Sequence, residues 1–149
     1  MIYLGIISSG IAWLASQGIK LAIKSGKKKV NWRDVFSYSD MPSSHTATVI
    51  GLAAYVAFDE GVSSPIFGAA FILALIVITD AIGLRNYLGQ HGKTLNVLVK
   101  DLKEDDFLDN RYPKLLEHIG HTPLQVLIGG LIGIIVAAII FFVGQAIGI

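Results

Sequence analysis

The chain has 149 residues, of which 53% are hydrophobic and only 15% are charged, and its net charge is +1. Soluble domains carry about 25% charged residues, so this composition excludes an ordinary water-soluble domain and indicates a protein that resides in lipid. The length suits a single domain. Cysteine is absent, which excludes disulfides, thiol catalysis and cysteine-based metal sites.

Four stretches without Asp, Glu, Lys or Arg predict an all-α integral membrane bundle of about four transmembrane helices. A helix needs about 20 apolar residues to cross a bilayer core of about 30 Å. Within one membrane domain, we expect helices over about residues 2–23, 43–58, 63–84 and 122–147. The second is the least secure, because its firmly apolar part is only about 15 Å long, and a half-helix is the alternative. No basic residues precede the first stretch, so we expect an uncleaved helix there.

The positive charges are confined to two connecting segments, about residues 24–40 and 85–121, and to the adjoining helix end at Lys20. Four crossings place both segments on one face, which the positive-inside rule assigns to the cytoplasm. We therefore expect both termini outside a plasma (inner) membrane. The basic run at residues 24–29 is interpreted as a topology signal that touches anionic headgroups. Nucleic acid is not an expected partner, because no aromatic residues are interleaved with this run.

The second connecting segment contains an amphipathic pattern. Leu95, Leu98 and Leu102 recur at helical spacing and predict an interfacial helix that lies on the membrane surface or caps the bundle. A solvated acidic loop is expected at residues 104–109, because its carboxylate spacing does not match a calcium loop. A short helix is expected over residues 114–119. His91 and His118 are interpreted as surface or interfacial residues.

Two short motifs carry the chemistry: MPSSHT at residues 41–46 and GHTP at residues 120–123. Each places a histidine at the start of an apolar helix, where unpaired N–H groups and the helix dipole favour an anion. The hydroxyls of Ser43 and Ser44 add donors for a phosphate. A neutral histidine can attack phosphorus while a protonated one protonates the departing oxygen. Either motif alone is more often a simple helix cap, but two on one predicted face favour a shared site.

These motifs, with Asp80-Ala81, Gly83 and Arg85, Gly89, and Leu95-Asn96 between them, resemble the divergent branch of the type-2 phosphatidic acid phosphatases. That branch is also described as related to acid phosphatases and vanadium-dependent haloperoxidases. The resemblance covers nearly the whole chain and implies a helical membrane phosphatase that uses no metal and no other cofactor. It implies that His45 is the general acid, that Ser43 binds phosphate and that His121 forms a phosphohistidine.

Two positions depart from the pattern of the well-studied relatives. Gln125 replaces the Asp that orients their nucleophilic histidine, and an amide cannot stabilise an imidazolium with a full negative charge. Leu115 replaces an Arg that binds phosphate in the relatives. Lys27 and Arg33 are only loose substitutes for their Lys and Arg-Pro motif.

Other residues are candidates for the missing contacts. Arg85 and Lys20 lie at the same predicted interface and can bind phosphate, and Thr122 is a further hydroxyl candidate. Asp80 ends an apolar span, where acids are costly and often functional, and its expected partner is Arg85 or a histidine. A purely structural pair of Asp80 with Arg85 is the alternative. Asn96 is a possible supporting residue, with a helix cap or a surface amide as the alternative.

The sequence therefore leaves two main functional hypotheses. The first is a phosphatase acting on a lipid or polyprenyl phosphate at the cytoplasmic interface, which the two histidines favour. The second is a non-catalytic protein that binds or transports such lipids, which Gln125 and Leu115 favour. A structural subunit would require neither histidine. Gly129 and Gly133 predict close helix packing, either within the chain or in a homo-oligomer.

Overall fold

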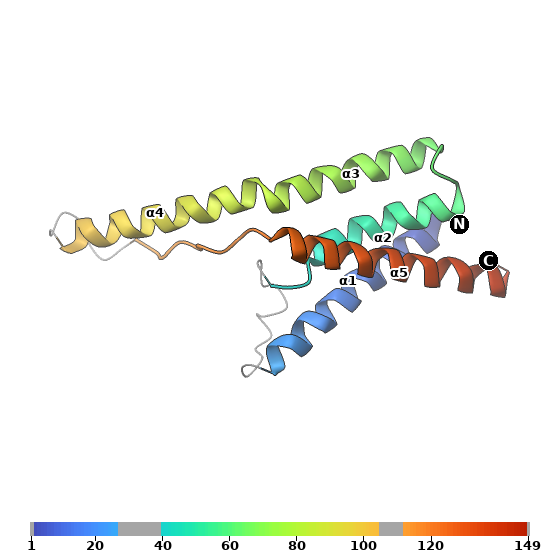
Figure 1. The fold of residues 1–149 in the computed structure, drawn as a ribbon, viewed down its shortest axis with the longest axis horizontal. Coiled ribbons are helices and arrows are strands. Elements are labelled where there is room, and N and C mark those ends of the chain that lie inside the picture. Colours follow the sequence, from blue (N-terminus) through green and yellow to red (C-terminus); the bar gives the residue numbers. More distant parts are fainter. Residues whose placement is uncertain (1, 27–39, 105–111, 149) are drawn as a thin grey trace.

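A computed structural model describes residues 2–26, 40–104 and 112–148. In this part of the chain there are five helices and no strand: α1 (Ile2–Ser25), α2 (Ser44–Asp59), α3 (Pro65–Ile82), α4 (Leu84–Glu104) and α5 (Pro123–Ile147). Helices α1, α2, α3 and α5 form a bundle in which successive helices run in opposite directions (Figure 1). The prediction of an all-helical membrane bundle is confirmed.

Three helices of the bundle begin at a side-chain cap. The hydroxyls of Ser43, Ser64 and Thr122 accept hydrogen bonds from backbone N–H groups in the first turns of α2, α3 and α5. Such a cap stabilises a helix by about 1 kcal/mol. The caps also fix where each helix starts, so that His45 lies in the first turn of α2 and His121 directly precedes the cap of α5.

Helix α2 packs against α1, α3 and α5 and is the centre of the bundle. Its contact with α5 depends on glycine. A Cβ atom added to Gly133 would lie 2.6 Å from the carbonyl oxygen of Ala47 and 2.8 Å from the nitrogen of Gly51. Gly129 likewise faces the backbone of Ser43. Of the two roles considered for this glycine pair, the structure places it in packing within the chain.

Three segments among the described residues are long and apolar enough to cross a membrane, Leu4–Ser25, Pro65–Leu102 and Pro123–Ile147. Helix α2 has 16 residues and a length of about 24 Å, which is shorter than the bilayer core of about 30 Å. It is surrounded by the other helices and can therefore satisfy its apolar surface with protein contacts. The expected fourth crossing thus corresponds to a shorter helix that runs alongside α3 and α5, while α1 crosses it at an angle (Figure 1).

Helix α4 was expected to lie on the membrane surface or to cap the bundle, and its direction differs from both expectations. It continues nearly in line with α3 and extends beyond the bundle (Figure 1), and α3 is the only described helix that it contacts appreciably. The reason is the short junction, since Gly83 alone separates the two helices. One residue gives the chain no room to turn back across the bundle end.

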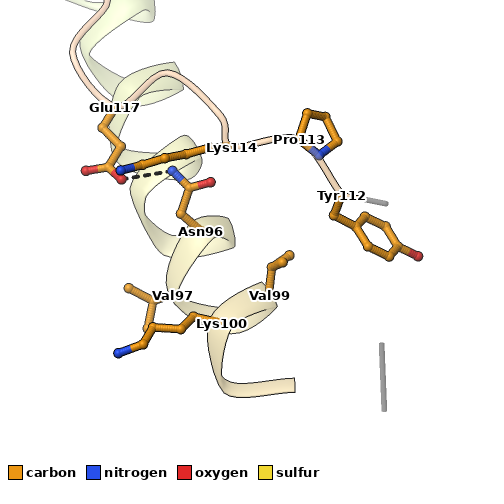
Figure 2. A pocket seen from close by; sticks show the side chains of 8 residues that line it. All are labelled: Asn96, Val97, Val99, Lys100, Tyr112, Pro113, Lys114 and Glu117. Carbon is orange, nitrogen blue, oxygen red and sulfur yellow. Dashed lines mark hydrogen bonds between the residues drawn. The ribbon is translucent and has the colours of Figure 1, made fainter. Parts of the chain in front are cut away.

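Residues 112–122, which lead back to the bundle, are extended and contain no helix, so the helix expected over residues 114–119 is wrong. The side chain of Asn96 donates to the carbonyl oxygen of Leu115 at 2.9 Å and accepts from its N–H at 2.9 Å. These bonds replace the ones that a helix would supply. Figure 2 shows Asn96 also bonded to Glu117, beside a cavity of about 420 Å³ between α4 and this segment. His91 and His118 are exposed, and the acidic stretch at residues 105–109 lies outside the described residues.

Candidate functional site

Four helix ends meet at the end of the bundle from which α4 projects. The N–H of Ser43, at the start of α2, donates to the carbonyl oxygen of Gln125 in the first turn of α5 at 3.1 Å. The N–H of His121 donates to the carbonyl oxygen of Ala81 near the end of α3 at 3.0 Å. Lys20 of α1 reaches Ser44 of α2. The two sequence motifs, which are far apart along the chain, are thereby joined in space.

Ser43 and Ser44 are both buried at the start of α2. The Ser43 hydroxyl oxygen accepts from the Thr46 hydroxyl at 2.9 Å and from the Thr46 N–H at 3.4 Å. A hydroxyl both accepts and donates, so capping does not consume its proton. Ser43 can therefore donate to an anion while its oxygen closes the first turn of α2.

Lys20 is the largest fully buried side chain in the described part of the protein, with an exposed fraction of 2%. Its Nζ donates to the Ser44 hydroxyl at 3.3 Å. A charge inside a membrane protein is costly and marks a functional position more often than a structural one. One helical turn further on, Lys24 forms an ion pair with Asp40 at 2.6 Å. The ammonium group of Lys20 places positive charge at the helix start where an anion would bind.

His121 is 3% exposed, and its Nδ1 atom is buried without a hydrogen-bond partner in the described residues. Burial is the main reason that the pKa of this imidazole is lowered to about 4, and the positive charges of Lys20, His45 and Arg85 contribute to the same shift. His45 is more exposed. The two histidines are therefore close enough to influence one another, and His121 is neutral at neutral pH, which is the form in which an imidazole is a nucleophile.

Asp80 and Arg85 form the pair expected from the sequence. The Nε atom of Arg85 donates to the Asp80 carboxylate at 2.6 Å across the junction of α3 and α4. Because this bond uses Nε, the two terminal nitrogens of the guanidinium are not engaged by the carboxylate and can bind an anion. The pair can thus be structural while Arg85 still places positive charge near His121, whose pKa Arg85 helps to lower.

Gln125 and Thr122 close the first turn of α5. The Gln125 side-chain oxygen accepts from the Thr122 N–H at 2.8 Å, and the Thr122 hydroxyl accepts from the Gln125 N–H at 3.3 Å. The oxygen with which Gln125 would hold a histidine ring is therefore used in the cap. Asn96 and Leu115 contact one another along α4, so the structure does not bring them to the helix ends.

One residue of this region was not singled out from the sequence. The Asn86 side chain donates to the carbonyl oxygen of Ile82 at 2.6 Å and to that of His121 at 3.3 Å. Beside it lies an open cavity of about 530 Å³ that reaches from α4 to Thr122 and Gln125. Its sequence position offers no signal beyond a polar residue in the first turn of a helix, because its partner lies 35 residues away.

The lowered pKa of His121 predicts a specific pH dependence. The pKa of about 4 in the folded protein is below the ordinary value of 6.5, so the unfolded chain takes up this proton first as the pH falls. The stability contributed by neutral His121 is complete above pH 6.5 and is lost progressively towards pH 4. Thermal unfolding of the wild type and of His121→Gln between these values should show a smaller pH dependence in the variant. Equal pH dependence in both proteins would contradict the assignment.

The helices and the clustered cations define an integral membrane protein with a group of cationic side chains, Lys20, Lys24 and Arg85, at one end of its bundle. Residues 4–136 match the Divergent PAP2 family, and the chain belongs to this family. It is 34% identical over 147 residues to the uncharacterized membrane protein YuiD of Bacillus subtilis, an alignment that covers 92% of this chain and 93% of that protein. No solved structure matches the chain significantly. The family resemblance noted from the two histidine motifs is therefore confirmed.

Proposed function

We propose that this protein is a membrane phosphatase that hydrolyses a lipid or polyprenyl phosphate through a phosphohistidine on His121. The observation that carries the proposal is a buried, neutral histidine held beside the start of α2 among positive charges. Membership of a phosphatase-related family supports the same chemistry. Membrane lipids then supply the substrate, and neither a metal nor another cofactor takes part.

Each residue has a defined role in this scheme. Lys20, Ser43, Ser44 and Arg85 bind the phosphate oxygens, aided by the positive end of α2. The neutral ring of His121 attacks phosphorus, so that a P–N bond forms as the P–O bond to the alcohol breaks.

Proton transfer completes the cycle. Protonated His45 gives its proton to the departing alcohol oxygen and then, as a neutral base, takes a proton from water. That water attacks the phosphohistidine, breaks the P–N bond and releases inorganic phosphate. Each bond that breaks is thus matched by one that forms, and His45 ends the cycle protonated.

A second function has its own supporting observation. The Gln125 oxygen caps α5, and no carboxylate stands at that position to stabilise an imidazolium. A protein that binds or transports lipid phosphates without cleaving them would need the group of cationic side chains but not this negative charge. The two candidates therefore differ in one measurable step, the formation of a P–N bond.

That step can be tested directly. Purified protein in mixed micelles is given a ³²P-labelled lipid phosphate and quenched in base, under which phosphohistidine survives. The proposal expects phosphate release and transient labelling of the wild type, with no labelling of His121→Gln. Saturable binding of the lipid phosphate without label or release would establish the second function instead. Vanadate should inhibit release, because it mimics the transition state of phosphoryl transfer.

We also propose that the candidate site faces the cytoplasm. The site lies at the bundle end of Lys20 and Lys24, whereas Ser63 lies in the connection between α2 and α3 at the other end. In inside-out and right-side-out vesicles, Ser25→Cys should react with a membrane-impermeant maleimide from the cytoplasmic side and Ser63→Cys from the outside. The reverse pattern would place the candidate site on the outer surface and contradict the positive-inside assignment.

A further inference from the structure

We propose that Asn86, together with the glycines on its side of α4, is a positioning residue for His121. It would act through the extended segment of residues 115–121, which we call the strap. The inference rests on the proposed function, because it assigns these residues to the placement of the nucleophile. None of them needs to touch the substrate.

The strap is held to the junction of α3 and α4 at its His121 end. Asn86 donates to the carbonyl oxygen of His121, and the His121 N–H donates to Ala81. The second bond of Asn86, to Ile82 at 2.6 Å, fixes the amide against its own helix. Gly120 lies so close to the Asn86 side chain that a Cβ atom there would collide with it.

The rest of the strap follows one side of α4. A Cβ atom at Gly89 would collide with the carbonyl oxygen of Glu117, and one at Gly92 would collide with that of Leu116. At the far end Asn96 bonds both backbone groups of Leu115. Positions 86, 89, 92 and 96 are three or four residues apart and therefore lie on one side of the helix. Two amides at the ends and two glycines between them thus fix the register of the strap.

This attachment matters because of how the nucleophile itself is held. The Nδ1 atom of His121 has no hydrogen-bond partner in the described residues. The position of the ring then depends on the backbone of His121. Asn86 fixes the carbonyl group of this backbone, and Ala81 at the end of α3 fixes its N–H group. A displacement of about 1 Å from the attacking geometry can cost about 100-fold in rate.

Two variants test the proposal by opposite means. Asn86→Ala removes the bond to His121, and Gly89→Ala pushes the strap away from α4. Each should lower kcat for a lipid phosphate by about 10- to 100-fold while KM changes by less than about threefold, because the phosphate ligands are unaffected. Gly68→Ala is the control, since a Cβ atom at Gly68 meets nothing within 4 Å. The double variant should lose less than the product of the two single losses, because both changes act through one strap.

A readout independent of turnover separates this inference from the proposed function. In ¹⁵N-histidine NMR spectra, with the His121 signal assigned by its loss in His121→Gln, the pKa of His121 should rise from about 4 towards 6.5 in both variants and not in Gly68→Ala. Wild type without turnover would refute the phosphatase proposal, and the NMR shift would still decide the positioning role. An unchanged kcat or an unchanged pKa in both variants would overturn the inference. The inference would also be overturned if the loss of activity appeared mainly as a higher KM. It would be overturned as well if the loss of activity only followed a lowered melting temperature of the variants.

Discussion

Replacing His121 with alanine is expected to lower phosphate release from every substrate by at least about 1,000-fold. The reason is that covalent catalysis loses its nucleophile. When such a group is removed, the remaining rate acceleration typically comes only from substrate binding.

Replacing His45 with alanine should affect the first step to a degree that depends on the leaving group. General acid catalysis contributes about 100- to 10,000-fold for an alcohol that leaves poorly, and almost nothing for a phenolate that leaves well.

The comparison requires two substrates, a lipid phosphate and p-nitrophenyl phosphate, measured with both variants under the same conditions. The expected result is that His45→Ala still releases a burst of p-nitrophenolate in the first step, although its turnover is slow because the base of the second step is lost. It should not release alcohol from the lipid phosphate at an appreciable rate, whereas His121→Ala loses the first step with both substrates. A suitable control is Lys93→Ala, which alters an exposed lysine of α4. This lysine lines the open cavity beside Asn86 and His121. If His45→Ala lost the first step with both esters and His121→Ala lost it only with the lipid, the two assigned roles would be reversed. Normal activity in His121→Ala would remove His121 from the scheme, and equal losses of the first step on both esters in His45→Ala would remove the general acid.

Gly129→Ala is expected to be the most disruptive single methyl addition in α5. A Cβ atom at this position would collide with the carbonyl oxygen of Ser43, which is backbone and cannot rotate away. Overpacking of this kind costs about 1–3 kcal/mol of unfolding free energy. It would also displace Ser43, a proposed phosphate ligand, so activity should fall together with stability.

Gly130→Ala is the matched control in the same helix. Its Cβ atom would meet only side-chain carbons of Ile50 and Thr46 at 3.9 Å, which is ordinary contact. Alanine also raises the stability of a helix interior by about 0.5–1 kcal/mol over glycine. Thermal unfolding in detergent should therefore show a lower melting temperature for Gly129→Ala and an unchanged or higher one for Gly130→Ala. Similar melting temperatures for the two variants would contradict the close approach of α2 and α5.

The positions of the helices follow from local rules and were accessible from the sequence. Apolar stretches without charge predict membrane helices, and Ser43 and Thr122 are residue types that cap helix starts. The arrangement of residues 84–104 and 112–121 could not be predicted in the same way. The amphipathic pattern predicts a helix, but the direction of α4 depends on the one-residue junction at Gly83, and the strap depends on bonds to Asn96.

The candidate site shows the same division. The two histidine motifs stand out by their composition and by their position before apolar helices. Asn86 does not stand out, because the group it bonds at His121 is distant in sequence. Similarly, Gln125 occupies a recognisable position after His121, but only the structure shows that its oxygen closes the cap of α5.

The sequence by itself determined that the chain is a helical membrane protein, which residues begin its helices, and which two motifs carry histidine chemistry. Those properties depend on composition and on neighbours within one helical turn. The tertiary structure decided that four helix ends meet, that Lys20 is buried against Ser44, and that His121 is buried and neutral. The physical reason is that burial and charge proximity are set by contacts between segments that no local pattern relates.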